Sequence, residues 1–204
     1  MAFVKTAGCV IAAAAALAAQ FPLRHQHVHG ECAGILTVDQ SGVSFAGPKG
    51  HAWKWPLLEI QQLKISPDGV SVLTYVHDRR FVFAGAAPAA ELVAMLRDRL
   101  GAKLVAAIAV PESGALMIAA RELHPESQGT LAIGGASIAY QAAAPGESRT
   151  WRFVDIETLS SSGEFELTIR TLERTFHFQL KEPLAEGRFD AIWMELQKKT
   201  GRVQ

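Results

Sequence analysis

Several features are scarce in this 204-residue sequence, and each absence removes a class of protein. It has two cysteines, Cys9 and Cys32. Cys9 falls in an N-terminal segment that we expect to be cleaved, so the mature chain would keep one cysteine and form no internal disulfide. Basic and acidic residues number 20 each. Because neither charge is in excess, no overall field would draw the chain to nucleic acid or to an anionic membrane.

Sequence motifs of common catalytic sites are also missing. The chain has no Gly-x-Ser-x-Gly turn, no glycine-rich phosphate-binding loop and no His-Glu-x-x-His pair. Three serines precede Gly163, a pattern typical of a turn rather than of a nucleophile. We therefore expect a protein that is not an enzyme and has no cofactor, while noting that a catalytic triad is defined by geometry and needs no motif.

The N-terminus has the features of an export signal. Lys5 supplies a positive charge, residues 10–17 are apolar, and Ala16-Leu17-Ala18 is a small-x-small cleavage site. The apolar stretch is shorter than the roughly 20 residues that cross a bilayer. We expect residues 1–19 to be a cleaved signal peptide and the protein to be exported, periplasmic or secreted. The alternatives are an uncleaved membrane anchor and a buried Ala-rich helix.

What the sequence does contain is an internal repeat, with matching residues 95 or 96 positions apart. The pairs at the first offset are His29 and His124, Glu31 and Glu126, Gly34 and Gly129, Leu36 and Leu131, Phe45 and Tyr140, Phe81 and Phe176, and Phe83 and Phe178. Those at the second are Trp55 and Trp151, Glu59 and Asp155, Ile60 and Ile156, and Leu63 and Leu159. This period is too long for a solenoid and indicates a duplicated domain. Residues kept in both copies are expected to serve the fold, and residues found in one copy are candidates for function.

Each copy predicts six or seven short strands followed by one amphipathic helix. Strands are expected at 21–28, 34–38, 43–45, 53–55, 60–65, 70–75 and 80–83, and again at 115–122, 130–133, 137–141, 150–153, 156–160, 165–170 and 175–180. Pro88 and Gly101 bracket the first helix, and Pro183 and Gly201 bracket the second. The predicted domains are residues 20–102 and 115–204, joined by an apolar packed linker, 103–114, that could extend the first helix.

This order of strands and helix, with a Gly-x-Leu strand, an aromatic next strand, a tryptophan and an acid-isoleucine pair, resembles the pleckstrin-homology-like (PH-like) fold and its GRAM-type branch. The resemblance implies a mainly β protein with one C-terminal helix per repeat, built as two tandem PH-like barrels that their helices cap. In lipid-binding members, basic residues flank the loop between the first two strands. The corresponding segments taken here, residues 39–42 and 134–136, contain no lysine or arginine. No phosphoinositide site is therefore expected.

A histidine cluster is the sharpest candidate site. On a strand, His25, His27 and His29 would project from one face, and Cys32 lies close by. Imidazole and thiolate are ligands that zinc and copper prefer, so these four residues are our predicted metal ligands. The alternative is structural, because His29 is matched by His124 and could serve the fold, while His25 and His27 stand near the mature N-terminus, where polar residues are common.

Other residues are candidate contacts for a partner. Trp55 and Trp151 occur in both copies and are expected in the core, whereas Trp53 is matched by Arg149 and could be exposed. Two hairpin tips carry mixed charge. The predicted partner contacts are Trp53, Arg79, Arg80, Arg149 and Arg174. The repeated acids Glu59 and Asp155 are expected to cap turns rather than to form a catalytic pair.

These observations favour an exported, non-enzymatic protein that binds a protein or peptide through a sheet edge or a helix–strand groove. The alternative is a metal- or small-ligand-binding protein that uses the histidine cluster. A membrane would be involved only if the N-terminal segment stayed uncleaved.

Overall fold

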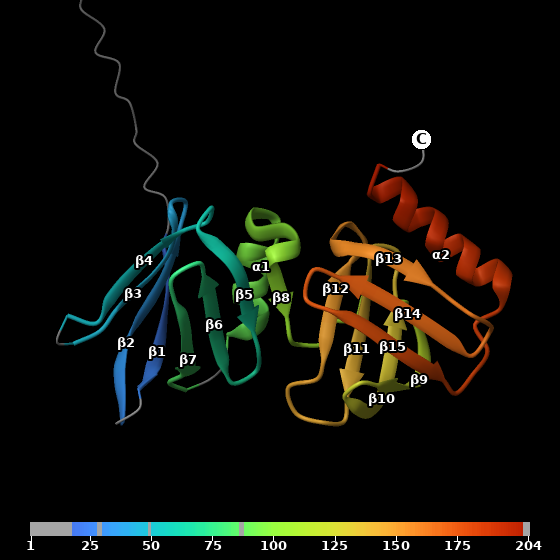
Figure 1. Ribbon diagram of the computed structural model, residues 1–204, viewed down its shortest axis with the longest axis horizontal. Coiled ribbons are helices and arrows are strands. Elements are labelled where there is room, and N and C mark those ends of the chain that lie inside the picture. The colour runs from blue at the N-terminus through green and yellow to red at the C-terminus, as the bar shows by residue number, and fades with distance from the viewer. Residues whose placement is uncertain (1–17, 28–29, 49, 86–87, 202–204) are drawn as a thin grey trace, which may run out of the picture.

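The computed structural model describes residues 18–27, 30–48, 50–85 and 88–201. The signal predicted at residues 1–19 and the candidate ligand His29 therefore lie wholly or almost wholly outside the described residues. Figure 1 shows two β halves side by side, with one helix between them and the other at the far end. Neither of these helices is long and apolar enough to cross a membrane.

The first half contains seven strands and a helix: β1 (Ala19–His27), β2 (Gly30–Asp39), β3 (Gly42–Ala46), β4 (Ala52–Pro56), β5 (Ile60–Ile65), β6 (Gly69–Thr74), β7 (Asp78–Phe83) and α1 (Ala89–Leu100). A 3-10 turn, η1 (Gly101–Lys103), and the short strand β8 (Leu104–Ala106) follow. The second half contains β9 (Leu116–Leu123), β10 (Glu126–Ile133), β11 (Ser137–Ala142), β12 (Arg149–Arg152), η2 (Phe153–Asp155), β13 (Ile156–Ser160), β14 (Glu166–Thr171), β15 (Thr175–Leu180) and α2 (Glu186–Lys199). Each predicted strand and helix is found, with boundaries that differ by a few residues.

The expectation of two closed barrels is wrong. All fifteen strands form one open sheet, in the order β13-β14-β15-β9-β10-β11-β12-β8-β5-β6-β7-β1-β2-β3-β4. After β4 the chain turns at Pro56, whose carbonyl accepts a hydrogen bond from the amide of Glu59 (2.9 Å). The next strand, β5, then pairs with β6 and β8. In the described part of the chain, β4 and β13 therefore end the sheet.

Strand β8 joins the two halves. It pairs in parallel with β5 and, through Ala106, with Thr150 of β12. Residues 105–108 are buried, as the apolar composition of this segment requires. The segment from 103 therefore continues as a strand, and not as an extension of α1.

Two hydrophobic cores lie on either side of this junction, and the repeated residues occupy both. Trp55 is buried in the first core and Trp151 in the second, as predicted. A side chain on Gly34 would lie 2.4 Å from the ring of Phe45, and one on Gly129 would lie 2.8 Å from the ring of Tyr140. Both glycines are thus kept because an aromatic ring on the neighbouring strand crosses over them.

The two helices bury their apolar faces to different extents. The stripe predicted on α1, which consists of Leu92, Val93, Leu96 and Leu100, is fully buried. On α2, Leu196 is buried and Phe189 and Ile192 pack against the second core, whereas Trp193 is 37% exposed. The end of the second half is therefore covered less completely.

The Asp39–Gly42 turn joins β2 to β3. A carboxylate oxygen of Asp39 accepts hydrogen bonds from the Ser41 amide (2.7 Å), the Ser41 hydroxyl (2.6 Å) and the Gly42 amide (3.1 Å). The first two strands, β1 and β2, end at His27 and begin at Gly30, and residues 28–29 lie outside the described residues. Residues 39–42, expected from the sequence to be the loop between the first two strands, therefore join the second strand to the third.

Candidate metal centre

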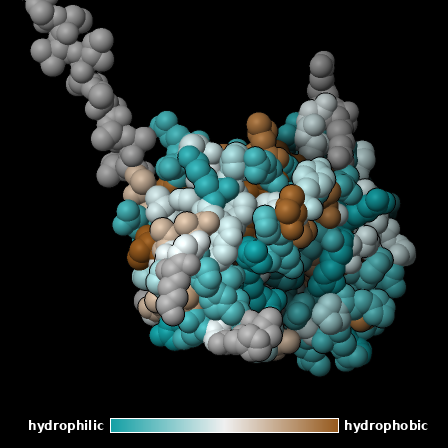
Figure 2. Space-filling view, turned by 60° about the vertical axis from the view of Figure 1, so that its left-hand side comes forward, coloured by the Kyte–Doolittle hydropathy of each residue, from teal (hydrophilic) through white to brown (hydrophobic). Residues whose placement is uncertain are grey.

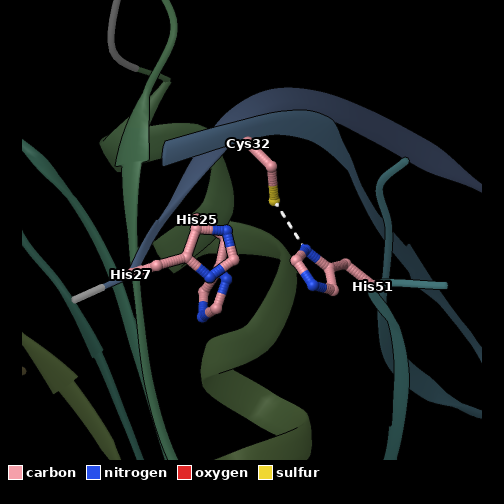
Figure 3. Close-up of side chains that lie close together, drawn as sticks. All are labelled: His25, His27, Cys32 and His51. Carbon is pink, nitrogen blue, oxygen red and sulfur yellow. Dashed lines mark hydrogen bonds between the residues drawn. The ribbon is translucent and has the colours of Figure 1, made fainter. Parts of the chain in front are cut away.

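Four side chains with metal-binding atoms converge at one end of the first half. They are His25 and His27 from β1, Cys32 from β2 and His51 from the turn before β4 (Figure 3). One candidate ligand atom of each lies within 4.8 Å of those of the other three. Alternation along β1 puts the two histidines on one face, and the register places Cys32 directly opposite His25.

His51 reaches the cluster because the β3–β4 turn is held closed. The amide of Gly47 donates to the carbonyl of His51 (2.7 Å), and the amide of His51 donates to the carbonyl of Pro48 (3.1 Å). The Nδ1 atom of His51 then lies 3.3 Å from the Sγ atom of Cys32. Its ring centroid is 4.6 Å from that of His27.

His25 is the most buried member of the set, with 6% of its surface exposed. Its Nδ1 atom has no hydrogen-bond partner among the described residues. Burial lowers the pKa of His25, and the nearby charges of His27, Arg79 and His51 lower it further. The neutral imidazole is the form that binds a metal ion, and ligation would satisfy a buried nitrogen that otherwise costs about 1–3 kcal/mol.

The spacing suits a tetrahedral ion after a small contraction. Zinc–nitrogen bonds of about 2.0–2.1 Å and zinc–sulfur bonds of about 2.3 Å place neighbouring ligand atoms roughly 3.3–3.6 Å apart. The Cys32–His51 pair already has this separation. The remaining atoms, at most 4.8 Å apart, need to approach by about 1.5 Å or less, which side-chain rotations can supply. Three imidazoles and a thiolate also suit copper.

Sequence reasoning found three of these four residues and missed His51. That histidine is 19 positions from Cys32 and belongs to another hairpin, so no local spacing connects the two. A signal was nevertheless present, because His51 is a single-copy residue whose match at the second offset is Glu147.

The corresponding place in the second half holds an ion pair instead. Leu36 and Leu131 match in the repeat, and their partners on the neighbouring strand are Phe21 and Ile118. Counting four residues onward from each partner gives His25 and Glu122, which therefore occupy matching positions. Glu122 is fully buried, and its carboxylate lies 2.8 Å from the guanidinium of Arg174. The same register matches His27, rather than His29, with His124. At this place in the second half the protein itself provides a cation, the half-buried guanidinium of Arg174.

The five predicted partner contacts have different surroundings. Trp53 packs against the first core, and the guanidinium of Arg79 lies over its ring at 5.2 Å from the centroid. Arg149 is buried and forms a two-point ion pair with Glu173 (3.0 and 3.1 Å), so it is not available to a partner. Arg174 is engaged with Glu122. Of the five, Arg80 alone is both exposed and without a hydrogen bond, ion pair or ring contact to any described residue.

The repeated acids have no common site. Asp155 accepts two hydrogen bonds from Arg152 (2.7 and 2.9 Å), which also reaches Asp98 on α1 (2.8 Å). Glu59 is exposed in the β4–β5 turn. Arg152, held by Asp155, therefore links α1 to the second half, and Glu59 shares none of these partners.

The cluster borders an open cavity of about 1100 Å³. His25, His27 and His51 line one part of it, and Lys64, Arg79 and Arg80 line another. Figure 2 shows this end of the molecule as mostly hydrophilic, with hydrophobic residues scattered between. The candidate metal ligands are therefore within reach of small solutes.

No family model matches the sequence, and no curated protein matches it. Among solved structures, the chain is similar to a chain in the structure of the Spt16D Pob3N heterodimer, at 11% sequence identity. The match covers 76% of this chain and 84% of that chain, with a TM-score of 0.36.

Proposed function

We propose that this protein binds a transition-metal ion, Zn²⁺ or a copper ion, through His25, His27, Cys32 and His51. The observation that carries the proposal is the convergence of four ligand atoms from three separate segments within 4.8 Å of one another. The buried, unpartnered Nδ1 atom of His25 supports it, because protein interiors seldom leave such an atom unsatisfied in the absence of a ligand.

The test is a metal titration of the full chain, by calorimetry and by elemental analysis after dialysis. We expect one ion per chain, and we expect His51→Gln and Cys32→Ala each to weaken binding by about 100-fold or more, because each removes one of four ligands. His177→Gln is the matched control, since His177 is an exposed strand histidine whose Nδ1 lies 3.2 Å from the Thr168 hydroxyl. Equal binding by wild type and His51→Gln would refute the site.

The identity of the metal has its own readout. A Cu²⁺ ion bound to the Cys32 thiolate would add a strong visible absorption band, and Zn²⁺ would leave the protein colourless. Loss of that band in Cys32→Ala, but not in His177→Gln, would assign copper to this cluster.

We further infer that each half is a PH-like unit and that the protein is exported and acts by binding rather than by catalysis. Seven strands followed by a helix in the first half, and the same order in the second, support the first inference. The charge, apolar stretch and small residues at the N-terminus support the second. Detection of the protein in the envelope or medium, with a mature N-terminus near residue 20, tests export.

A second candidate function, the binding of a protein or peptide by strand addition, is favoured by the open end of the sheet at β4. Because Gly47 and His51 form one hydrogen-bonded pair, strand alternation points the amide of Lys54 away from β3. Lys54→Pro should therefore abolish the capture of a strand-adding partner while the domain stays folded. A partner that binds this variant normally would exclude this edge.

A further inference from the structure

A row of polar side chains crosses four strands of the first half and lines the cavity beside the histidine cluster. In register, Lys64 of β5 pairs with Ser71 of β6, and Ser71 pairs with Arg80 of β7. His25 of β1 pairs with Phe81 of β7, so the next residue of β1, Gln26, lies beside Arg80 of β7. All four residues line this cavity.

The row lies on the face of the sheet that points away from the core. The neighbours of its members along the strands, Ile65, Val70, Val72 and Phe81, are buried in the first core. Strand alternation therefore turns Lys64, Ser71 and Arg80 to the opposite face. There they meet the second half, because Gly146 and Glu147 line an adjoining cavity of about 420 Å³ with the same four residues.

The charges of the row are poorly compensated within the described residues. Arg80, Ser71 and Gln26 have no side-chain hydrogen bond or ion pair there, and Lys64 has a single long contact with Glu173 (3.8 Å). Glu173 already forms its two-point ion pair with Arg149. The larger cavity is lined by three cations, Lys64, Arg79 and Arg80, and by one acid, Asp78. The adjoining cavity adds two acids, Asp68 and Glu147, of which Glu147 is paired with Arg174 at 3.5 Å.

We propose that this row binds a small anionic molecule through a carboxylate or phosphate group, held by Arg80 and Lys64 above the Ser71 hydroxyl. Neighbouring strands are about 4.8 Å apart, so Lys64 and Arg80 stand roughly 10 Å apart on either side of Ser71. Their long side chains span that distance and converge on one oxyanion, while Gln26 adds an amide donor. Burial lowers the pKa of Lys64 and the charge of Arg149 lowers it further, while the carboxylates of Glu173 and Glu147 oppose the shift.

This binding does not depend on the proposed metal, and the experiment separates the two. Full chain is stripped of metal, desalted and titrated by calorimetry with inorganic phosphate and with succinate at low salt. We expect saturable binding of one or both probes that weakens as salt is added. Arg80→Gln and Lys64→Gln should each weaken it about 10- to 100-fold, because each removes a charged hydrogen bond. Because the chain carries no metal in this titration, the result does not depend on the proposed metal site.

Arg188→Gln is the matched control, because Arg188 is an exposed arginine on α2 in the other half. A second arm uses sedimentation with phosphatidylglycerol vesicles and phosphatidylcholine vesicles. Arg80-dependent binding of the anionic vesicles without binding of phosphate or succinate would support the row and assign the anion to a lipid headgroup. The proposal is overturned if neither probe nor vesicle binds saturably. It also fails if Arg80→Gln and Lys64→Gln bind like wild type, or if Arg188→Gln weakens binding as much as they do.

Discussion

Arg174→Met should destabilise the protein strongly, and more at alkaline than at acid pH. The Glu122 carboxylate is fully buried, and the guanidinium of Arg174 lies 2.8 Å from it. The same guanidinium lies 4.1 Å from the ring centroid of Phe176 and 3.5 Å from a carboxylate oxygen of Glu147. Methionine keeps most of the apolar stem of arginine and removes its charge, so Glu122 loses its closest cation.

The size of the effect follows from the burial of Glu122. Removing one partner of a buried ion pair costs about 3–5 kcal/mol, because it leaves the other charge uncompensated. Burial raises the pKa of Glu122 even though Arg174 opposes the rise. A carboxyl whose pKa is higher in the folded state contributes most to stability below its unfolded pKa of about 4.3, and loses that contribution as pH rises through the folded pKa. Without Arg174 the folded pKa rises further. The loss should therefore be about 3–5 kcal/mol at pH 8 and about 1 kcal/mol at pH 4.

Urea unfolding followed by circular dichroism at both pH values gives the two free energies. Glu122→Gln and the double variant complete a mutant cycle, in which we expect a coupling free energy of about 2 kcal/mol or more at pH 8. The double variant should be more stable than Arg174→Met there, because it buries no charge. Equal losses at pH 4 and pH 8, or a wild-type stability of Arg174→Met at pH 8, would refute the reasoning.

Three further predictions concern stability. Hydrogen bonds from Ser137, Gly135 and Ala136 outweigh the effect of burial and lower the pKa of Glu112. The contribution of Glu112 to stability is therefore present above its unfolded pKa and lost as pH falls through its folded pKa. Glu112→Gln should cost about 1 kcal/mol of unfolding free energy at pH 7 and almost nothing at pH 3, measured by urea unfolding. Gly129→Ala should cost about 2 kcal/mol or more, since its Cβ would lie 2.2 Å from the carbonyl oxygen of Gln141, whereas Gly187→Ala, with nothing within 4 Å, should be neutral or stabilising. Zinc at about 100 times its dissociation constant should add roughly 2.7 kcal/mol and raise Tm by about 5–10 °C in scanning calorimetry, and chelation or His51→Gln should remove that gain.

Local patterns in the sequence were enough to predict the elements. Alternation marked β7 through Phe81 and Phe83, and the Asp39–Gly42 turn marked the β2–β3 hairpin, because both depend on residues next to each other. The joining of the two halves could not be found in this way. It depends on the pairing of Thr150 with Ala106, which are far apart in the sequence. Ala106 belongs to β8, a strand of three residues with no distinctive sequence pattern.

Three of the four residues of the candidate metal centre could be predicted for the same reason. His25, His27 and Cys32 belong to one hairpin, so their spacing along the chain already placed them together. His51 joins them through the packing of β3 against β2 and β4, which becomes evident only when the register is known. The register also shows that His124 corresponds to His27 and not to His29. The offset between matched residues differs by two positions before and after the first hairpin of each half.

His25 in the first half and Glu122 in the second are buried polar residues at matching positions, and different side chains surround them. In the second half, Arg174 reaches inward to a buried carboxylate. Its match in the first half, Arg79, instead lies over Trp53, a residue that the second half replaces with Arg149. The cluster of the first half therefore consists of imidazoles and a thiol, with no carboxylate among its described members, and the charge of Arg79 lies near His25. Neutral imidazoles and a thiolate attract a soft metal cation where a lone carboxylate would accept an arginine. This exchange of ligand types, more than the number of histidines, is the reason to expect a metal ion in the first half and none in the second.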